Sequence, residues 1–389
     1  MKSLKPSFFF LIAAIGALAI FSSTLSKTPV LPLFAASLGA SPTEIGWIVI
    51  ASTIPGILIS FPAGALADHL GTRRVLLASL VVFATAPFLY LGVENTWQLM
   101  AVRFYHGFAT AIFGTVASAA IAERYTQDRA ARLSTYSSAT IVGRSLAPFL
   151  GGFLISLASY GAVYVACAIS GVLALAAGLL LPESRPTQTK ASARPRFWAS
   201  LKEVLRDRGI LLVSTIEAAQ YLVFGAIEAF LALYAASLGV PAWQIGIILG
   251  VQLVSIVFAK PLMGRLSDRI GRRRVILPGL ALGAISVALL PWVSEFFGLA
   301  TLSLVFGLGF ATVTSSTSAL VADLTRNGRF GASMGVLRTV MDVGQSIGPV
   351  LTGWMVAIAG YASAFNLLAA ILLAAAVLLG TLFRSPQAG

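Results

Sequence analysis

The sequence predicts an all-α membrane protein that crosses the bilayer many times. Three observations predict this class: 58% of the 389 residues are hydrophobic, only 11% are charged, and apolar residues stand in continuous runs such as 371–379. Soluble domains carry about 25% charged residues, because a water-facing surface must be polar. The composition therefore excludes a soluble enzyme, a nucleic-acid-binding protein and a disordered scaffold. The continuous runs also exclude an outer-membrane barrel, whose strands alternate apolar and polar residues.

The length accommodates about a dozen membrane spans, because one helix needs about 20 apolar residues to cross the hydrocarbon core. We predict twelve transmembrane helices, at residues 7–34, 45–66, 75–93, 97–121, 131–157, 162–182, 209–236, 243–263, 275–292, 297–321, 330–357 and 362–383. The N-terminal apolar stretch lacks a small-residue cleavage site, so we interpret it as the first span rather than as a signal peptide.

The chain divides into two halves that repeat in sequence. The longest polar interruption predicts an N-terminal six-helix bundle at 1–182, a central loop at 183–208 and a C-terminal six-helix bundle at 209–389. Residues 33–39 match residues 233–239 at a shift of 200, and residues 143–148 parallel 344–349 at a shift of 201. Shared bilayer chemistry does not place polar loop residues in register, so we predict two pseudosymmetric bundles with a substrate site between them.

The distribution of charge predicts the orientation. The net charge is +13, but Lys and Arg gather in alternate connections, and the connections between those contain none. Cytoplasmic loops collect basic residues in this way, so we expect a multi-pass protein of the cell membrane with a cytoplasmic central loop and both termini cytoplasmic. Cys167 is the single cysteine, so no intrachain disulfide can form.

The strongest repeated motif lies at 64–74 and again at 264–274. Its residues resemble the loop signature of the major facilitator superfamily, and the resemblance covers essentially the whole chain. It implies the two-bundle fold, transport by alternating access, and a cytoplasmic latch formed by Gly64, Asp68, Gly71, Arg73, Arg74, Gly264, Asp268, Gly271, Arg273 and Arg274. Positive-inside anchoring is the alternative, and it explains the arginines but not the register of Gly and Asp. His69 departs from the family pattern, which has Arg or Lys there.

The fourth and fifth spans carry two further motifs. Arg103 and Gly107 resemble the family's helix 4 motif, whose Arg is associated with proton coupling, and His106 replaces the usual Gln. An intramembrane Arg normally faces a cavity or a partner, although Arg103 is close enough to the outer end to snorkel. The helix 5 stretch resembles the Gly/Pro-rich motif of proton-coupled antiporters, with a pivot at Gly143, Pro148, Gly151 and Gly152; packing alone is the alternative.

The remaining charges within spans suggest a pathway for substrate and protons. Glu217 and Glu228 are eleven residues apart on one helix face, about 16 Å along the axis, with polar and aromatic residues between them. Arg338 and Asp342 stand at i and i+4 and can pair directly. Lys260 suggests a snorkelling anchor. The predicted pathway residues are Lys27, Arg103, Arg144, Glu217, Gln220, Tyr221, Phe224, Glu228, Arg338 and Asp342.

Together these features predict a proton-coupled secondary transporter. Glu217 or Glu228 would carry the proton, and the basic residues of the N-terminal half favour an anionic, zwitterionic or neutral amphipathic substrate. The helix 5 motif favours efflux by antiport. Uptake by symport, a non-transporting sensor, and charges that merely neutralise one another are the alternatives. We expect no catalytic site, metal or cofactor, and no nucleic acid partner; the expected partners are a small molecule, protons and lipid, and the expected state is a monomer.

Overall fold

The computed structural model of the protein describes residues 7–183, 204, 206–325 and 330–382, except for the side chains at 57, 60–65, 68, 130, 330 and 331. Among these residues the secondary structure is helical throughout. The chain divides into two compact units, Met1–Thr189 with Pro241–Gly246, and Lys190–Val240 with Ile247–Gly389. Each unit is described by itself below.

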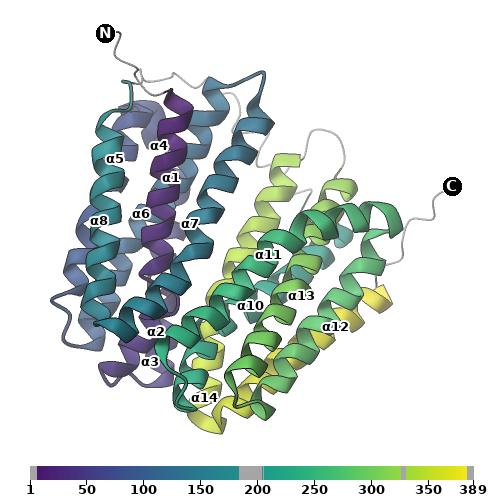
Figure 1. The fold of residues 1–389 in the computed structure, drawn as a ribbon. Coiled ribbons are helices and arrows are strands. Elements are labelled where there is room, and N and C mark those ends of the chain that lie inside the picture. The colour runs from purple at the N-terminus through teal and green to yellow at the C-terminus, as the bar shows by residue number, and fades with distance from the viewer. Residues whose placement is uncertain (1–6, 184–203, 205, 326–329, 383–389) are drawn as a thin grey trace. The chain divides into compact units, whose positions relative to one another are not determined.

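The first unit is a bundle in which α1 packs against α7 and α8, α5 against α6 and α8, and α4 against α6. Figure 1 shows α1, α5, α6, α7 and α8 running side by side. Its helices are α1 Phe8–Leu25, α2 Val30–Ser37, α3 Pro42–Ala51, α4 Thr53–Leu70, α5 Thr72–Tyr90, α6 Thr96–Arg124, α7 Arg129–Leu157 and α8 Tyr160–Leu179.

The second unit repeats this plan, with α10 packed against α13 and α14, and α12 packed against α13 and α14. Its helices are α10 Arg208–Ser237, α11 Ala242–Ile270, α12 Arg272–Leu289, the short 3-10 helix η2 Leu290–Trp292, α13 Phe296–Leu324 and α14 Phe330–Leu382. The long α14 contains a break at Gly360, whose φ of +79° is not helical, so it comprises two successive helices.

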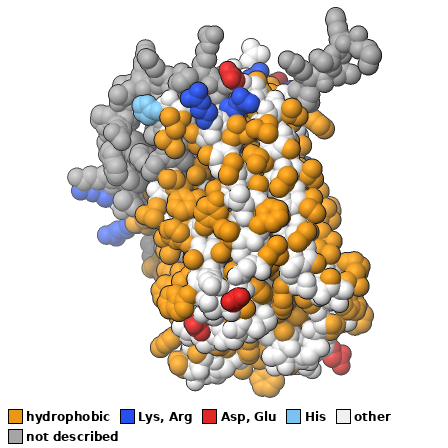
Figure 2. All heavy atoms as spheres, turned by 90° about the vertical axis from the view of Figure 1, so that its left-hand side faces the viewer, with side chains coloured by type: hydrophobic (Ala, Val, Ile, Leu, Met, Phe, Trp, Pro, Cys, Tyr) orange, Lys and Arg blue, Asp and Glu red, His pale blue; other side chains and the backbone are white. Residues whose placement is uncertain are grey.

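Helical segments lie at each of the twelve predicted span positions. Ten stretches of the described chain are long and apolar enough to cross a membrane, and one of them, Ala332–Leu382, has 51 residues and includes the Gly360 break. Figure 2 shows the matching surface on the side of the first unit: hydrophobic side chains cover most of this face, and the few charged side chains include a group near the top and scattered acidic ones in the lower third. The protein is therefore a multi-pass membrane protein.

Two details of the helices differ from the sequence prediction. The first span is not continuous: α1 ends at Leu25 and α2 begins at Val30, after a turn that contains Lys27 and Pro29. Proline has no N–H to donate within a helix, which favours a break there. Helices α4 and α11 also continue past the apolar run to Leu70 and Ile270, because hydropathy marks the hydrocarbon core and not the end of the helix.

Both longer helices end at a glycine of the repeated motif. Gly71 has φ of +88° and Gly271 has φ of +99°, a backbone conformation that side chains with a Cβ disfavour. The next helix starts at the following residue in each case. The repeated motif is thus the last turn of one helix and the first turn of the next, joined by one glycine.

A close contact between the second and fourth predicted membrane spans recurs in the two units. A Cβ added at Gly107 on α6 would lie 2.8 Å from the Cα of Ser52, which separates α3 from α4. A Cβ added at Gly307 on α13 would lie 2.6 Å from the carbonyl oxygen of Gln252 on α11. Small residues allow helix backbones to approach in this way in membranes.

We predict that Gly107→Ala destabilises the protein. The new methyl group would meet backbone that cannot move aside as a side chain can, and such overpacking costs about 1–3 kcal/mol. The measurement is the melting temperature of the purified protein in detergent. Gly114→Ala is the matched control, since Gly114 lies on the same helix with nothing within 4 Å of an added Cβ. Equal melting temperatures for the two variants would contradict the close contact.

Candidate transport site and contacts of the repeated motif

A buried carboxylate lies inside the second unit. Glu217 on α10 is 2% exposed, and its Oε2 accepts a hydrogen bond from the Thr317 hydroxyl on α13. The ammonium of Lys260 on α11 acts electrostatically on the same carboxylate. A carboxylate in the hydrocarbon region needs a cation, a hydrogen bond or a proton. Glu217 has a cation in Lys260 and a hydrogen bond from Thr317, and its carboxylate can also bind a proton.

Lys260 belongs to this group and does not act as a snorkelling anchor. Its side chain is half-buried, and its Nζ lies 5.6 Å from the centroid of the Phe310 ring. Phe310 packs in turn against Phe224 at 4.4 Å and Tyr221 at 5.0 Å between ring centroids. A cation over an aromatic face is stabilised by the ring quadrupole. The structure therefore places Lys260 among the pathway residues predicted on α10.

The predicted stripe on α10 is mostly enclosed by its own unit. Gln220 is 0% exposed and Phe224 is 1% exposed, whereas Tyr221 is half-buried. Neither amide atom of Gln220 has a hydrogen-bond partner among the described residues, and its Nε2 would lie 3.9 Å from a Cβ added at Gly283 on α12. In this structure Gln220 and Phe224 are therefore core residues. Glu228, 5% exposed, is buried on the same helix.

The expected pairing of Arg338 with Asp342 is not formed. Arg338 is exposed and Asp342 is half-buried, and the ion pairs of the described residues do not include them. Spacing at i and i+4 brings the two Cβ atoms near each other but leaves the side-chain rotamers free. An ion pair with an exposed guanidinium contributes little stability. The i, i+4 spacing alone is therefore not enough to predict that the pair forms.

A buried guanidinium lies inside the first unit. Arg103 on α6 is 4% exposed; its Nη2 donates to the Ser52 hydroxyl at 2.7 Å, and its Nη1 donates to the Tyr90 hydroxyl at 3.4 Å. Arg103 is therefore not a snorkelling residue, because it is turned toward neighbouring helices. The Tyr90 hydroxyl also lies 3.4 Å from Nδ1 of His106, which is 2% exposed.

The repeat reproduces the Ser52–Arg103 contact with uncharged residues. At the positions shifted by 200, the Ser303 hydroxyl on α13 donates to the Gln252 Oε1 on α11 at 3.1 Å. We call these two hydrogen bonds the interhelical locks, Ser52–Arg103 in the first unit and Gln252–Ser303 in the second. Each lies beside the close contact made by Gly107 or Gly307.

The other predicted residues of the first unit are spread over separate places. Lys27 is half-buried in the turn between α1 and α2, and Arg144 is exposed on α7. Two of the predicted pivot glycines face α1 and α2: a Cβ at Gly143 would lie 2.6 Å from the Ala17 carbonyl oxygen on α1, and one at Gly151 would lie 3.1 Å from the Val30 side chain on α2. Pro148 and Gly152 are buried.

The same packing recurs in the second unit. Gly344, shifted by 201 from Gly143, lies against the backbone of Ala218 on α10, shifted by 201 from Ala17. A contact that occurs in both units favours close packing as the role of the shared glycine. The role of a pivot stays a prediction.

The repeated motif of the second unit forms a charged triad. The Arg272 guanidinium pairs with Asp268 one turn before it and, at 3.0 Å, with Asp323 at the end of α13. Arg273 donates to the carbonyl of Gly380 near the end of α14. The last carbonyls of a helix have no partner within that helix, so Arg273 supplies one. Gly264 is half-buried with open space around it, and Arg274 is exposed.

The first unit repeats the helix-end contact but not the triad. Arg73 donates to the carbonyl of Leu179 at 2.8 Å, near the end of α8, and pairs with Glu183 at 3.7 Å. Thr72 stands where the second unit has Arg272. Gly64 and the Asp68 side chain lie outside the described residues, and Arg74 is exposed.

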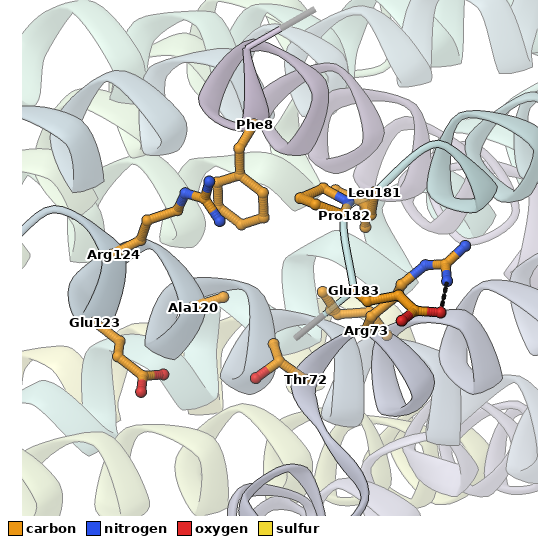
Figure 3. A pocket seen from close by; sticks show the side chains of 10 residues that line it. Phe8, Thr72, Arg73, Ala120, Glu123, Arg124, Leu181, Pro182 and Glu183 are labelled. Carbon is orange, nitrogen blue, oxygen red and sulfur yellow. Dashed lines mark ion pairs between the residues drawn. The ribbon is translucent and has the colours of Figure 1, made fainter. Parts of the chain in front are cut away.

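A pocket of about 240 Å³ opens beside this motif. Figure 3 shows Arg73 directed toward Glu183, and Arg124 directed toward the ring of Phe8. Its lining residues are Phe8, Thr72, Arg73, Leu76, Ala120, Glu123, Arg124, Leu181, Pro182 and Glu183. The pocket therefore lies between the ends of α1, α5, α6 and α8.

Sequence reasoning missed several of these residues. Arg272, Asp323, Thr317, Ser52 and Gln252 were not singled out. The signal for Arg272 was the difference from Thr72 at an otherwise matched position, and the signal for Asp323 was an acidic residue at the end of a span. No group of three or more potential metal ligands occurs among the described residues.

Comparison with known proteins identifies the family. The family model described as Major Facilitator Superfamily matches residues 12–251 and 213–389, which is most of the chain. The chain belongs to the major facilitator superfamily. It is a membrane transporter of small molecules and not an enzyme. The motifs at 64–74 and 264–274 thus identified the superfamily correctly.

Two relatives are named for drug resistance. The multidrug resistance protein MdtG of Proteus mirabilis is 25% identical over 372 residues, covering 92% of each chain. The quinolone resistance protein NorA of Staphylococcus aureus is 23% identical over 333 residues, covering 84% of each chain.

Solved structures share the superfamily fold. A variant of the nucleoside transporter NupG superposes with a TM-score of 0.84 at 15% identity, covering 97% of this chain and 100% of that one. A bacterial homologue of the lysosomal transporter Spinster gives a TM-score of 0.80 at 14% identity, covering 98% of this chain and 95% of that one.

We predict that Arg272→Gln lowers the transport rate several-fold while changing the melting temperature little. Arg272 holds two partly exposed carboxylates, and exposed ion pairs contribute only about 0–1 kcal/mol to stability. An effect on the latch would instead change the balance between inward-open and outward-open states. The measurement is transport in vesicles beside a melting curve. Arg265→Gln is the control, since Arg265 is an exposed arginine near the end of α11 and is not one of the predicted latch residues, and equal rates for the two variants would argue against the latch.

Proposed function

We propose that the protein is a proton-coupled secondary transporter that works by alternating access. The most specific form of the proposal is an efflux antiporter for a small amphipathic compound, anionic, zwitterionic or neutral. The observation that carries proton coupling is Glu217, a buried carboxylate with a hydroxyl partner on another helix and a lysine nearby.

The physical argument rests on the cost of charge in hydrocarbon. An ionised carboxylate at this depth depends on Thr317 and Lys260 for compensation, whereas a protonated carboxyl does not. A small change in the surroundings of Glu217 therefore changes which form is favoured. Rearrangement of α10 against α11 or α13 would bind or release a proton, and this is what coupling requires.

Efflux is supported by the relatives and by the helix 5 motif. MdtG and NorA are named for resistance to multiple drugs and to quinolones. Gly143, Pro148, Gly151 and Gly152 resemble the motif of proton-coupled antiporters. The driving force is adequate, because moving one charge through 100 mV supplies about 2.3 kcal/mol.

The latch and the orientation complete the proposal. The triad of Asp268, Arg272 and Asp323 would stabilise one conformation, together with the matching motif at 64–74. The basic residues of the alternate connections support a cytoplasmic location for these motifs and for both chain ends.

We predict that Glu217→Gln abolishes transport driven by a pH gradient, with at least a tenfold loss of rate, and makes the residual transport independent of pH. The amide retains the shape and can accept from Thr317, but it cannot take up a proton. The measurement is drug-induced proton flux in everted vesicles with a pH-sensitive dye, using compounds chosen by a growth screen of an overexpressing strain.

Glu228→Gln is the comparison variant, since Glu228 is buried on the same helix. We expect it to keep the pH dependence even where the rate falls. Loss of pH dependence in Glu228→Gln alone would show that Glu228, and not Glu217, carries the proton. Intact pH dependence in both variants would refute the assignment, and proton entry together with the substrate would show symport.

A further inference from the structure

Four polar side chains form a buried cluster within the first unit, which we call the Arg103 cluster. Its members are Tyr90 on α5, Arg103 and His106 on α6, and Tyr164 on α8, exposed by 1%, 4%, 2% and 1%. The rings of Tyr90 and Tyr164 stack in parallel at 4.3 Å. Tyr90, His106 and Tyr164 each lie within electrostatic range of the Arg103 guanidinium.

The fold does not require a polar cluster at this place. The corresponding positions of the second unit, shifted by 200 on the first three and by 201 on the last, hold Leu290, Ser303, Phe306 and Phe365. All four are buried. The same helices therefore pack around an almost entirely apolar set in one unit and around a polar set in the other.

The positive charge of Arg103 is not required by the interhelical lock. In the second unit the lock is a hydrogen bond between the neutral side chains of Ser303 and Gln252. In the first unit the same bond is made by a guanidinium, and among the described residues no carboxylate forms an ion pair with it. A buried cation without a counter-charge is strongly unfavourable. Its presence calls for a charge of opposite sign.

The hydrogen bonds within the Arg103 cluster leave several donor atoms without an acceptor. The Tyr90 hydroxyl accepts from Arg103, so its own proton is available for Nδ1 of His106. When Nδ1 accepts this hydrogen bond, the neutral imidazole carries its one N–H proton on Nε2. Nε2 of His106, Nε of Arg103 and the hydroxyl of Tyr164 have no hydrogen-bond partner among the described residues. All three can donate, and an anion accepts from such donors more strongly than a neutral group does.

We propose that the Arg103 cluster is a binding site for a small monovalent anion, either a free halide or the carboxylate of a small solute. The three donor atoms are shielded from solvent in this structure, so the anion enters when α6 separates from α5 or α8. The site lies wholly within the first unit, and it does not depend on proton coupling at Glu217.

The test is anion-dependent stability of the full-length protein in detergent. Sodium chloride and sodium formate are compared with sodium gluconate at equal ionic strength, because gluconate is a much larger anion than the other two. A ligand at ten times its Kd should raise the melting temperature by about 2 °C or more. Stabilisation by chloride points to a free halide, and stabilisation by formate alone points to a solute carboxylate.

The decisive variant transplants the lock of the second unit. The double substitution Ser52→Gln with Arg103→Ser copies Gln252 and Ser303, so it removes the charge while keeping a neutral hydrogen bond between the same helices. We expect it to melt cooperatively in gluconate and to lose the response to both small anions. His106→Phe and Tyr164→Phe, which copy Phe306 and Phe365, should each weaken the response.

Arg124→Gln is the matched control, since Arg124 is an exposed arginine at the other end of α6. We expect its anion response to equal that of the unaltered protein. Equal melting temperatures in chloride, formate and gluconate would overturn the proposal. So would an anion response that survives in the double variant, or one that Arg124→Gln abolishes.

Discussion

The structure depends on one constraint: a polar group in hydrocarbon must find its partner within the protein. Helices satisfy the backbone, and short contacts at Gly107, Gly307, Gly143 and Gly344 bring the helices close enough for side chains to satisfy one another. The two interhelical locks follow from this closeness. A buried polar group that lacks a partner in this structure is therefore informative, because it is expected to gain a partner in another conformation or when a ligand binds.

The internal repeat separates what the fold needs from what function adds. Contacts present in both units, such as the locks and the helix-end contacts of Arg73 and Arg273, serve the architecture. Residues present in one unit alone are not required by the architecture that the two units share. Glu217 and the Arg103 cluster are of this kind. At the shift of 201 that relates Ala218 to Ala17, the position of Glu217 holds Gly16 in the first unit, and the cluster is replaced by an almost entirely apolar set in the second.

Much of the fold could be predicted from the sequence, because hydropathy reports directly on the hydrocarbon core. The twelve span positions and the register of the repeat came from apolar runs and from matched polar residues. The break before Val30 and the helix ends at Gly71 and Gly271 depend on local backbone geometry, which hydropathy does not report.

The site was less accessible to prediction. Charges within spans marked Glu217 and Arg103, but spacing could not show which face of α10 is enclosed, so Gln220 and Phe224 were assigned to a cavity. Partners from distant parts of the chain, such as Thr317 for Glu217 and Ser52 for Arg103, become visible only when the helices are assembled.

The bond from Arg73 to Leu179 has a mechanical consequence. Leu179 ends α8, only a few residues before the long polar connection, and Arg73 begins α5 just after the glycine turn. A displacement of the last turn of α8 would move the Arg73 guanidinium and, with it, the first turn of α5, where the proposed latch lies. Loss of the hydrogen bond from Arg73 to Leu179 would leave the helices folded but would uncouple the end of α8 from the start of α5.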